Sequence, residues 1–369
     1  MKILVTGAKG FVGKNLVAQL KNEGILDIYE YDVDTNAEML DKFTADCEFI
    51  FHLAGVNRPQ CEEEFMKGNF GFTSQLLDLL KKNNNKSPIL LSSSIQAELD
   101  NPYGQSKKAG EELMIAYSQE TDTEVFLYRL PNVFGKWCRP NYNSVIATFC
   151  NNIANDLPIK INDPDVILKL VYIDDVVREF INTLKGKDNK LSGYCSIEQF
   201  YEIKLGEIVK QLYSFKEIRN DKSIPDMSNS FTKKLYSTYL SYLPKDKFCY
   251  PLKMNVDNRG SFTEFIKTAD RGQVSINISK PGITKGNHWH HTKNEKFLVV
   301  NGKGVIKFRQ VHSNEIIEYY VSGDKLEVID IPTGYTHNII NLGETDMITV
   351  MWANETFDPE NPDTFFLEV

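Results

Sequence analysis

Apolar residues recur in two kinds of segment over the first part of the chain. Short runs such as KILVT (2–6), PILLSS (88–93) and VFLYRL (125–130) have the length of buried strands. Longer stretches between such runs, for example 11–22 and 65–82, repeat apolar residues at helical spacing. Strands that alternate with helices in this way predict an α/β fold, a doubly wound, Rossmann-like parallel sheet with helices on both faces.

The pattern changes in the last third of the chain. Short alternating runs appear there, separated by Gly, Pro or Asn and without helical periodicity. These runs are QVSINIS, EKFLVV, GVIKFRQV, IIEYYV, LEVIDI, HNIINL and MITVMW. Closely spaced short strands favour an all-β antiparallel sandwich or barrel. We therefore predict two domains, residues 1–243 and 252–369, on either side of a Pro-containing stretch.

Composition and charge narrow the class of protein. The chain has 369 residues, 41% of them apolar, a formal net charge of -8 and six cysteines. The length suits two domain cores, and an acidic chain argues against nucleic acid or an anionic membrane surface as a partner. The cysteines are scattered without a C-x-x-C pair, which we interpret as reduced thiols in a cytoplasmic protein. No apolar run is long enough to span a bilayer, so we expect no membrane insertion.

A glycine-rich turn follows the first predicted strand. GAKGFVG places Gly7, Gly10 and Gly13 before and within the start of a helix that also contains Phe11 and Val12. Glycines at this position let the backbone approach a pyrophosphate, and the helix N-terminus offers free N–H donors. Because the turn lies in the first strand–helix–strand unit, we predict that these residues bind a dinucleotide.

The residue that ends the second predicted strand bears on the choice of cofactor. Asp32 lies about 20 residues after the glycines, where an acid often receives the ribose 2′-hydroxyl of NAD. Lys9 and Lys14 flank the glycines and could instead serve the 2′-phosphate of NADP. These residues leave the choice open.

A tyrosine and a lysine are four residues apart at the start of a predicted helix. In NPYGQSKKAGE, Tyr103 and Lys107 lie on one helix face. A neighbouring ammonium should lower the pKa of the phenol, so that it can exchange a proton with a carbonyl oxygen while hydride moves. Upstream, LLSSSIQ ends a strand with Ser92, Ser93 and Ser94, and one of these hydroxyls would hold the substrate oxygen. A surface Tyr–Lys pair is the alternative for this spacing alone.

Together these motifs resemble the extended short-chain dehydrogenases/reductases that act on nucleotide sugars. TGAKGFVG, HLAG, GNFGFT, SSS, YGQSK, RLPNVFG and LVYIDDVV occur in the order of that family. The resemblance implies that Ser94 is the catalytic serine, with Ser93 as the second choice. It also implies that Tyr103 is the acid and Lys107 its partner.

The same resemblance implies further residues of the site. Ala54 and Gly55 would contact the cofactor, and Asn69 would have a structural and proton-relay role. Asn132 and Arg139 would contact the substrate or its diphosphate. The aromatic-Gly pair that usually follows the serine is replaced by IQAELDN, so we expect an atypical substrate pocket.

Half of the six histidines lie in the stretch GNHWHHTKNE. Strand alternation places His288 and His290 on one face, and Glu295 completes an H-x-H-x4-E pattern. His337 follows a P-x-G turn further along the chain. Three imidazoles and one carboxylate can hold a divalent metal, with Zn²⁺ as the first candidate and manganese, nickel or iron as alternatives.

GNHWHHTKNEKFLVVNG and GDKLEVIDIPTGYTHNIIN resemble the two motifs of a cupin barrel. A barrel without metal is one alternative. Another is that His288 or His290 is a proton-transfer base, as in the sugar-epimerising cupins that the segment also resembles, and we name His290 as the candidate. One ring nitrogen cannot serve as metal ligand and base at once. His291 should lie on the opposite face, and His312 should be a surface residue.

The fusion of these two domains resembles bifunctional enzymes of capsular polysaccharide synthesis. It implies a UDP-2-acetamido-2,6-dideoxy-4-keto-hexose as substrate, epimerised at C3 in the cupin domain. NADPH-dependent reduction at C4 would then give UDP-2-acetamido-2,6-dideoxy-L-talose, a precursor of UDP-N-acetyl-L-fucosamine. The ketone acidifies the neighbouring C–H bond, so epimerisation has to precede reduction. The alternative is a single-activity reductase or 4-epimerase with a non-catalytic sugar-binding cupin. Both families commonly pair, so we expect a homodimer.

Overall fold

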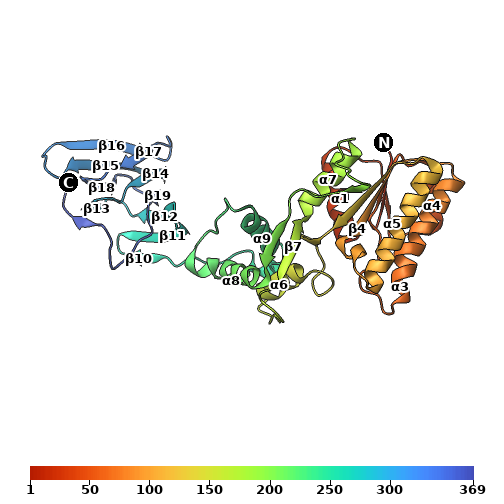
Figure 1. Ribbon diagram of the computed structural model, residues 1–369. Coiled ribbons are helices and arrows are strands. Elements are labelled where there is room, and N and C mark those ends of the chain that lie inside the picture. The colour runs from red at the N-terminus through yellow and green to blue at the C-terminus, as the bar shows by residue number, and fades with distance from the viewer. The chain divides into compact units, whose positions relative to one another are not determined.

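The computed structural model describes all 369 residues and divides into two compact units (Figure 1). The first unit comprises residues 1–213 and 229–244, and the second comprises 214–228 and 245–369. The domain limits drawn from the sequence remain a prediction. No helix combines the length and the apolar character that crossing a membrane requires.

The first unit contains helices and short strands in alternation. Its strands are β1 (Ile3–Thr6), β2 (Ile28–Tyr31), β3 (Phe49–His52), β4 (Ile89–Ser94), β5 (Val125–Leu130), β6 (Asn132–Phe134), β7 (Ile167–Tyr172), β8 (Tyr194–Cys195) and β9 (Tyr201–Lys204). Its helices are α1 (Phe11–Asn22), α2 (Glu38–Asp46), α3 (Glu63–Phe65), the π-helical turn η1 (Met66–Gly71), α4 (Phe72–Lys82), the 3-10 turn η2 (Ile95–Glu98), α5 (Pro102–Thr121), α6 (Val145–Ala154), α7 (Ile173–Leu184), α9 (Ser230–Leu240) and the start of α8 (Leu205–Asp221).

Six strands of this unit form one parallel sheet in the order β2-β1-β3-β4-β5-β8. Helices α1 and α7 lie on one side of it and α4 and α5 on the other (Figure 1). The predicted doubly wound α/β fold is thus confirmed. The strand order reverses between β1 and β3, and ligands of such sheets bind at that switch point, outside the carboxyl ends of the strands.

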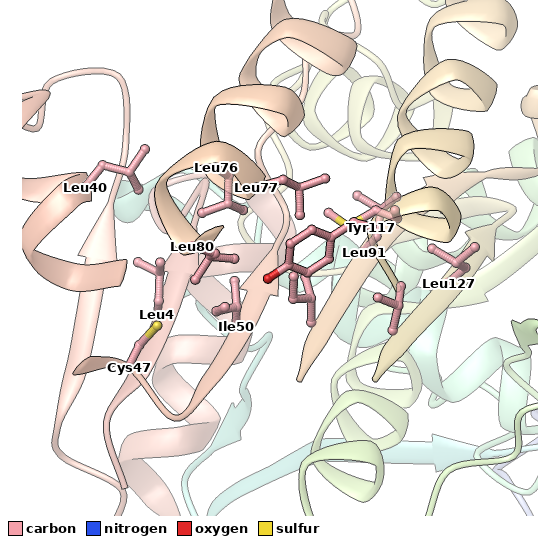
Figure 2. Close-up of a cluster of buried hydrophobic side chains, with 13 residues drawn as sticks. Leu4, Leu40, Cys47, Ile50, Leu76, Leu77, Leu80, Leu91, Tyr117 and Leu127 are labelled. Carbon is pink, nitrogen blue, oxygen red and sulfur yellow. The ribbon is translucent and has the colours of Figure 1, made fainter. Parts of the chain in front are cut away.

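Buried leucines attach α4 to the sheet. Leu76, Leu77 and Leu80 of α4 face Leu4 of β1 and Ile50 of β3, all almost inaccessible to solvent (Figure 2). Each such side chain stabilises the fold by about 1.5–3 kcal/mol relative to an exposed position. This packing fixes the carboxyl ends of β1 and β3, which border the first site described below.

His52, the last residue of β3, provides a test of this core. Its Nδ1 lies 2.7 Å from Thr6 Oγ1 and its Nε2 2.9 Å from Thr73 Oγ1. Burial lowers the pKa of His52 to about 3, and the Lys107 ammonium adds to this effect. The unfolded residue has a pKa near 6.5, so between these values only the unfolded chain binds the proton, and stability is lost as pH falls.

We expect His52 to make the first unit ~2 kcal/mol less stable at about pH 5 than at about pH 7.5. Chemical denaturation at both pH values should show that His52→Gln loses this part of the pH dependence. The matched control is His312→Gln, because His312 is exposed. An unchanged pH dependence in His52→Gln would contradict the prediction.

The second unit contains the end of α8 and is otherwise built almost entirely from strands. They are β10 (Asn255–Asp257), β11 (Gly260–Thr268), β12 (Gly272–Ser279), β13 (Thr284–Trp289), β14 (Glu295–Asn301), β15 (Lys303–Gln310), β16 (Ile316–Ser322), β17 (Val328–Ile331), β18 (Tyr335–Asn341), β19 (Met347–Ala353) and β20 (Phe365–Phe366), preceded by the 3-10 turn η3 (Lys245–Lys247). They form two antiparallel sheets, β10-β11-β12-β19-β14-β17 and β16-β15-β18-β13-β20. The predicted all-β class is confirmed, and the arrangement is consistent with a cupin-like domain.

The hydrophobic core of the second unit is formed by strands of both of its sheets. Phe297 and Val299 of β14 pack with Ile306 and Phe308 of β15 and Ile339 of β18. His337 lies two residues before Ile339, on the same face of β18, and replaces the apolar residue expected there. The hydrophobic core therefore gives way to a buried polar cluster at one end of β18.

Candidate active sites

A cavity of about 1350 Å³ opens in the first unit at the carboxyl ends of the parallel strands. Its position matches the switch point between β1 and β3. Apart from Asn69, the structure brings together there the residues that the sequence proposed for the cofactor and the reducing site: Gly7, Gly10, Phe11, Val12, Gly13, Asp32, Ala54, Gly55, Ser94, Tyr103, Lys107, Asn132 and Arg139.

The backbone around the turn between β1 and α1 leaves no room for a side chain at Gly7 or Gly13. Gly7 has a φ of +71°, which favours glycine, and a Cβ on Gly13 would lie 2.2 Å from the Gly7 carbonyl oxygen. Gly10 precedes α1 and makes no side-chain cap, so the first N–H groups of the helix stay available to a ligand. The turn thus fits the pyrophosphate of a dinucleotide.

Asp32 lies at the edge of this cavity with part of its hydrogen-bonding capacity used. Its Oδ2 accepts from the Lys9 backbone N–H at 2.7 Å, and its Oδ1 accepts from Val33 N–H at 2.8 Å. The Lys9 ammonium pairs with Asp34. The structure therefore places the Asp32 carboxylate where the adenosine ribose of a dinucleotide would lie, and one of the two lysines that flank the glycines is already paired with another acid.

Lys107 is buried in the wall of the cavity. Its ammonium donates to the carbonyl oxygen of Ser92 at 2.7 Å. Burial lowers the pKa of Lys107 to about 8, although the nearby carboxylate of Glu111 opposes this. Lys107 therefore supplies a hydrogen-bond donor that is held in place and is mostly protonated at neutral pH.

The expected lowering of the Tyr103 pKa by Lys107 is not found. Burial raises the pKa of Tyr103, and a hydrogen bond with Ser94 opposes this only in part. The physical reason is that the phenol is desolvated while the Lys107 ammonium is directed to Ser92. In this structure the phenol of Tyr103 is therefore protonated rather than ionised.

The three serines at the end of β4 have different partners. Ser93 is buried and donates to Glu111, whose carboxylate also accepts from Arg129 Nη2 at 2.6 Å. Ser94 lines the cavity and its Oγ accepts from the Gln96 backbone N–H at 3.2 Å. Of the two candidates, only Ser94 is in hydrogen-bonding contact with Tyr103.

Asn69 lies in the π-helical turn η1 and is buried. Its Oδ1 accepts from Val56 N–H at 2.9 Å, and its Nδ2 donates to Val56 O at 3.1 Å and to Ser106 Oγ at 2.9 Å. These bonds fix the loop at Val56, directly after Ala54 and Gly55. A water-sized cavity of about 10 Å³ lies between Asn69 and Lys107.

The opposite wall of the cavity carries the proposed substrate residues. Asn132 donates to Lys169 O at 3.2 Å, and the Arg139 guanidinium lies 5.5 Å from the centre of the Tyr142 ring. Trp137, which the motifs did not point to, lines the same wall with 52% of its surface exposed and a φ of +68°. An exposed aromatic residue in a left-handed conformation at a cavity is a strained feature, and strain of this kind is concentrated at ligand sites.

The second unit contains the four predicted metal ligands in one cluster. One nitrogen or oxygen of each of His288, His290, Glu295 and His337 lies within 4.8 Å of those of the others. Strand pairing explains this, because His288 of β13 is paired with His337 of β18. Asn287, with a φ of +61°, is the unpaired residue of a bulge between the Gly286–Asn338 and His288–His337 pairs.

The donor atoms of this cluster fit a divalent metal. His290 Nε2, Glu295 Oε2 and both ring nitrogens of His337 are buried without a hydrogen-bond partner. Glu295 Oε2 lies 3.5 Å from His290 Nε2 and 3.3 Å from His337 Nε2. Buried polar atoms without partners are costly, and a cation at the centre of the cluster would satisfy one such atom of each of His290, Glu295 and His337.

The protonation states of His288 and Glu295 also favour a metal site. Burial lowers the pKa of His288 to about 4, and the neighbouring His337 acts in the same direction. Burial acts to raise the pKa of Glu295, but the imidazoles of His290 and His337 next to its carboxylate outweigh burial and hold this pKa below its usual range. The cluster thus contains a neutral imidazole and a carboxylate near neutral pH, the forms in which these groups bind metals.

The other two histidines considered from the sequence lie outside the cluster. The ring of His291 is exposed and packs 4.6 Å from Trp289 and 4.9 Å from Phe365, between ring centres. His312 is exposed, as predicted. Asp363, which no motif indicated, contacts the cluster through its carbonyl oxygen, 2.6 Å from His290 Nδ1.

Comparisons with known proteins match both units. Residues 3–194 match the NAD dependent epimerase/dehydratase family, and residues 255–365 match a polysaccharide biosynthesis C-terminal domain. The chain is 46% identical to the UDP-2-acetamido-2,6-beta-L-arabino-hexul-4-ose reductase of Pseudomonas aeruginosa, over 100% of this chain and 99% of that protein.

Solved structures are also similar over the whole of this chain. The capsular polysaccharide assembling protein CapF from Staphylococcus aureus is 60% identical with a TM-score of 0.95, and all of both chains is covered. A structure of CapF with the inhibitor 3-isopropenyl-tropolone is 56% identical with a TM-score of 0.91, again over all of both chains.

Proposed function

The chain belongs to the NAD dependent epimerase/dehydratase family, with a polysaccharide biosynthesis C-terminal domain, and from this premise we propose a bifunctional nucleotide-sugar enzyme of capsular polysaccharide synthesis. The proposed substrate is a UDP-2-acetamido-2,6-dideoxy-4-keto-hexose. Residues 252–369 would epimerise it at C3, and residues 1–243 would reduce its C4 ketone with NADPH. The product would be UDP-2-acetamido-2,6-dideoxy-L-talose. The observation that carries the proposal is the presence of two separate candidate sites in one chain.

The ketone links the two reactions. A carbonyl at C4 makes the C3–H bond acidic, so a base can remove that proton and a proton can return on the opposite face. Hydride addition at C4 converts the carbonyl to a hydroxyl and ends this acidity. The second unit would therefore act first and the first unit second.

In the first site the protein's own groups would handle the carbonyl oxygen. Bound NADPH would supply the hydride for C4. Ser94 would hold the C4 oxygen, and Tyr103, protonated because burial raises its pKa, would give its proton to that oxygen as the hydride arrives. Lys107, fixed on Ser92 O, would supply positive charge next to the resulting phenolate.

In the second site His288, His290, Glu295 and His337 would hold a divalent metal, Zn²⁺ first among the candidates. When bound, a metal supplies Lewis-acid polarisation of a carbonyl oxygen. His290 has one free lone pair, at Nε2, because its Nδ1 faces Asp363 O. That lone pair serves as ligand or as base, and we assign it to the metal because four donor atoms converge there. If His290 were the base instead, adding Zn²⁺ would inhibit C3 exchange.

The cofactor choice yields a prediction at Asp32. A 2′-phosphate on the adenosine ribose would lie near this carboxylate, so Asp32→Asn should shift the ratio of the NADH and NADPH dissociation constants about tenfold towards NADPH. Fluorescence titration with both nucleotides checks this. Asp27→Asn, at an exposed acid outside the cavity, is the matched control. An unchanged ratio in Asp32→Asn would remove Asp32 from cofactor selection.

An NMR time course in heavy water with the keto-sugar nucleotide tests the whole proposal. Without NADPH, deuterium should enter C3; with NADPH, the signals of the C4-reduced sugar should replace those of the ketone. Reduction without C3 exchange would instead indicate a reductase with a sugar-binding cupin. Copurification of NAD with the protein, without net NADPH oxidation, would indicate a 4-epimerase. The predicted homodimer can be checked by sedimentation of the same sample.

A further inference from the structure

The segment near the C-terminus holds the loop that carries His290. The Asp363 carboxylate accepts three successive backbone N–H groups: Oδ1 accepts from His291 at 3.0 Å, and Oδ2 accepts from Thr292 and Lys293, each at 2.8 Å. Oδ2 also accepts from the Thr292 hydroxyl at 3.1 Å. One carboxylate thus satisfies three of the four backbone N–H groups between the second histidine and Glu295, and the fourth, of Asn294, donates to Asn354 Oδ1.

The backbone of the same segment reaches the histidine itself. The Asp363 carbonyl oxygen lies 2.6 Å from His290 Nδ1, a distance at which the ring N–H donates to it. A backbone carbonyl can only accept, so this contact places the proton on Nδ1 and leaves Nε2 bare, facing Glu295. The tautomer and the orientation of the ring are therefore set by a residue that does not face the centre of the cluster.

Two further observations show that this segment is held firmly in place. Asp363 has a φ of +39°, an unfavourable conformation that persists only where the surroundings enforce it. Lys293 is almost fully buried and donates to Pro362 O at 3.3 Å and to Thr364 Oγ1 at 3.0 Å. Contacts in both directions therefore tie residues 362–364 to the loop 290–293.

We propose that Asp363 is a positioning residue for the second site: its carboxylate holds the loop 290–293 so that its carbonyl oxygen fixes the Nδ1–H tautomer of His290. This inference rests on the proposed function, because it assigns Asp363 to the metal site proposed there. Asp363 is not a ligand, and it acts only through His290. Loss of such an outer partner typically weakens metal binding about 10- to 100-fold.

The test uses the full chain, Zn²⁺ and a competing chromogenic chelator. Asp363→Gly keeps the carbonyl and suits the positive φ but removes the carboxylate, so the Zn²⁺ dissociation constant should rise about 10- to 100-fold. Asp363→Asn retains one side-chain oxygen and should fall between this variant and the wild type. Asp346→Ala, an exposed acid of the same unit without a side-chain hydrogen bond, should bind as the wild type does.

Imidazole ¹⁵N spectra of the metal-free proteins provide a readout that does not depend on activity. His290, assigned by the loss of its signals in His290→Gln, should be the Nδ1–H tautomer in the wild type and in Asp363→Asn, and a mixture in Asp363→Gly. Wild-type affinity and tautomer in both variants would overturn the inference. If Asp363→Gly does not fold, wild-type affinity in Asp363→Asn overturns it and weakened affinity supports it. Failure of the wild type to bind Zn²⁺ would instead reject the metal site itself.

Discussion

Tyr103→Phe should lower the turnover number of NADPH oxidation with the keto-sugar nucleotide by about 10²- to 10⁴-fold, the contribution of a positioned proton donor. The variant removes one hydroxyl from the cavity and leaves the glycine turn, Asp32 and the Lys107–Ser92 bond unchanged. NADPH affinity, measured by fluorescence titration, should therefore stay close to that of the wild type. Stopped-flow absorbance of NADPH with saturating substrate gives the turnover number.

The matched control for this variant is Tyr117→Phe. Tyr117 lies on the same helix, but its hydroxyl donates to Asn85 O at 3.3 Å in the core, away from the cavity. Turnover in this control should be unchanged. Deuterium incorporation at C3 should continue in Tyr103→Phe, because the second unit would carry out that step. Wild-type turnover in Tyr103→Phe would remove the residue from the role of acid.

His337→Asn should abolish tight metal binding at the second site. Purified wild-type protein is expected to contain about one divalent ion per chain, and the variant should bind Zn²⁺ at least about 100-fold more weakly. Both ring nitrogens of His337 are buried without partners, so no other bond compensates for the lost ligand. Elemental analysis and chelator competition measure the affinity, and the unfolding temperature should fall to that of metal-free wild type.

Deuterium entry at C3 is expected to disappear in His337→Asn, while NADPH affinity should not change. His312→Asn provides the control, because it removes an exposed imidazole from the same unit. A wild-type protein that is free of metal, with normal stability and full C3 exchange, would show that the cluster works without an ion. In that case the bare Nε2 of His290 becomes the candidate base.

The parts of the structure predicted well from sequence are those in which burial follows a regular period. The helix expected at 11–22 is α1 with the same limits, and the run 125–130 is β5, because these segments bury apolar side chains. The sequence placed His288 and His290 on one strand, and β13 contains His288 but ends at Trp289, before His290. β11 was missed because Ser261 and Thr263 are buried while Phe262 is 37% exposed, which inverts the usual alternation.

In the candidate sites, too, the sequence predicted some features and not others. Residues near one another in a motif, such as Tyr103 and Lys107, could be placed from spacing alone. The contact between Asp363 and His290 joins residues 73 positions apart, and no periodicity encodes it. The direction of the Tyr103 pKa shift was also wrong from sequence, because it depends on desolvation and on where the Lys107 ammonium points.

The bulge at Asn287 has a consequence for protein design. Lys285 is paired with Ile339 and His288 with His337, so residues separated by an odd number of positions occupy the same face of the strand. If only the H-x-H triplet were transplanted onto a regular strand of another scaffold, the histidines would be kept. The residues before His288 would then lie on the opposite face of the strand from the one they occupy here. The transferable module is the whole segment 285–290, together with an acceptor that plays the part of the Asp363 carbonyl.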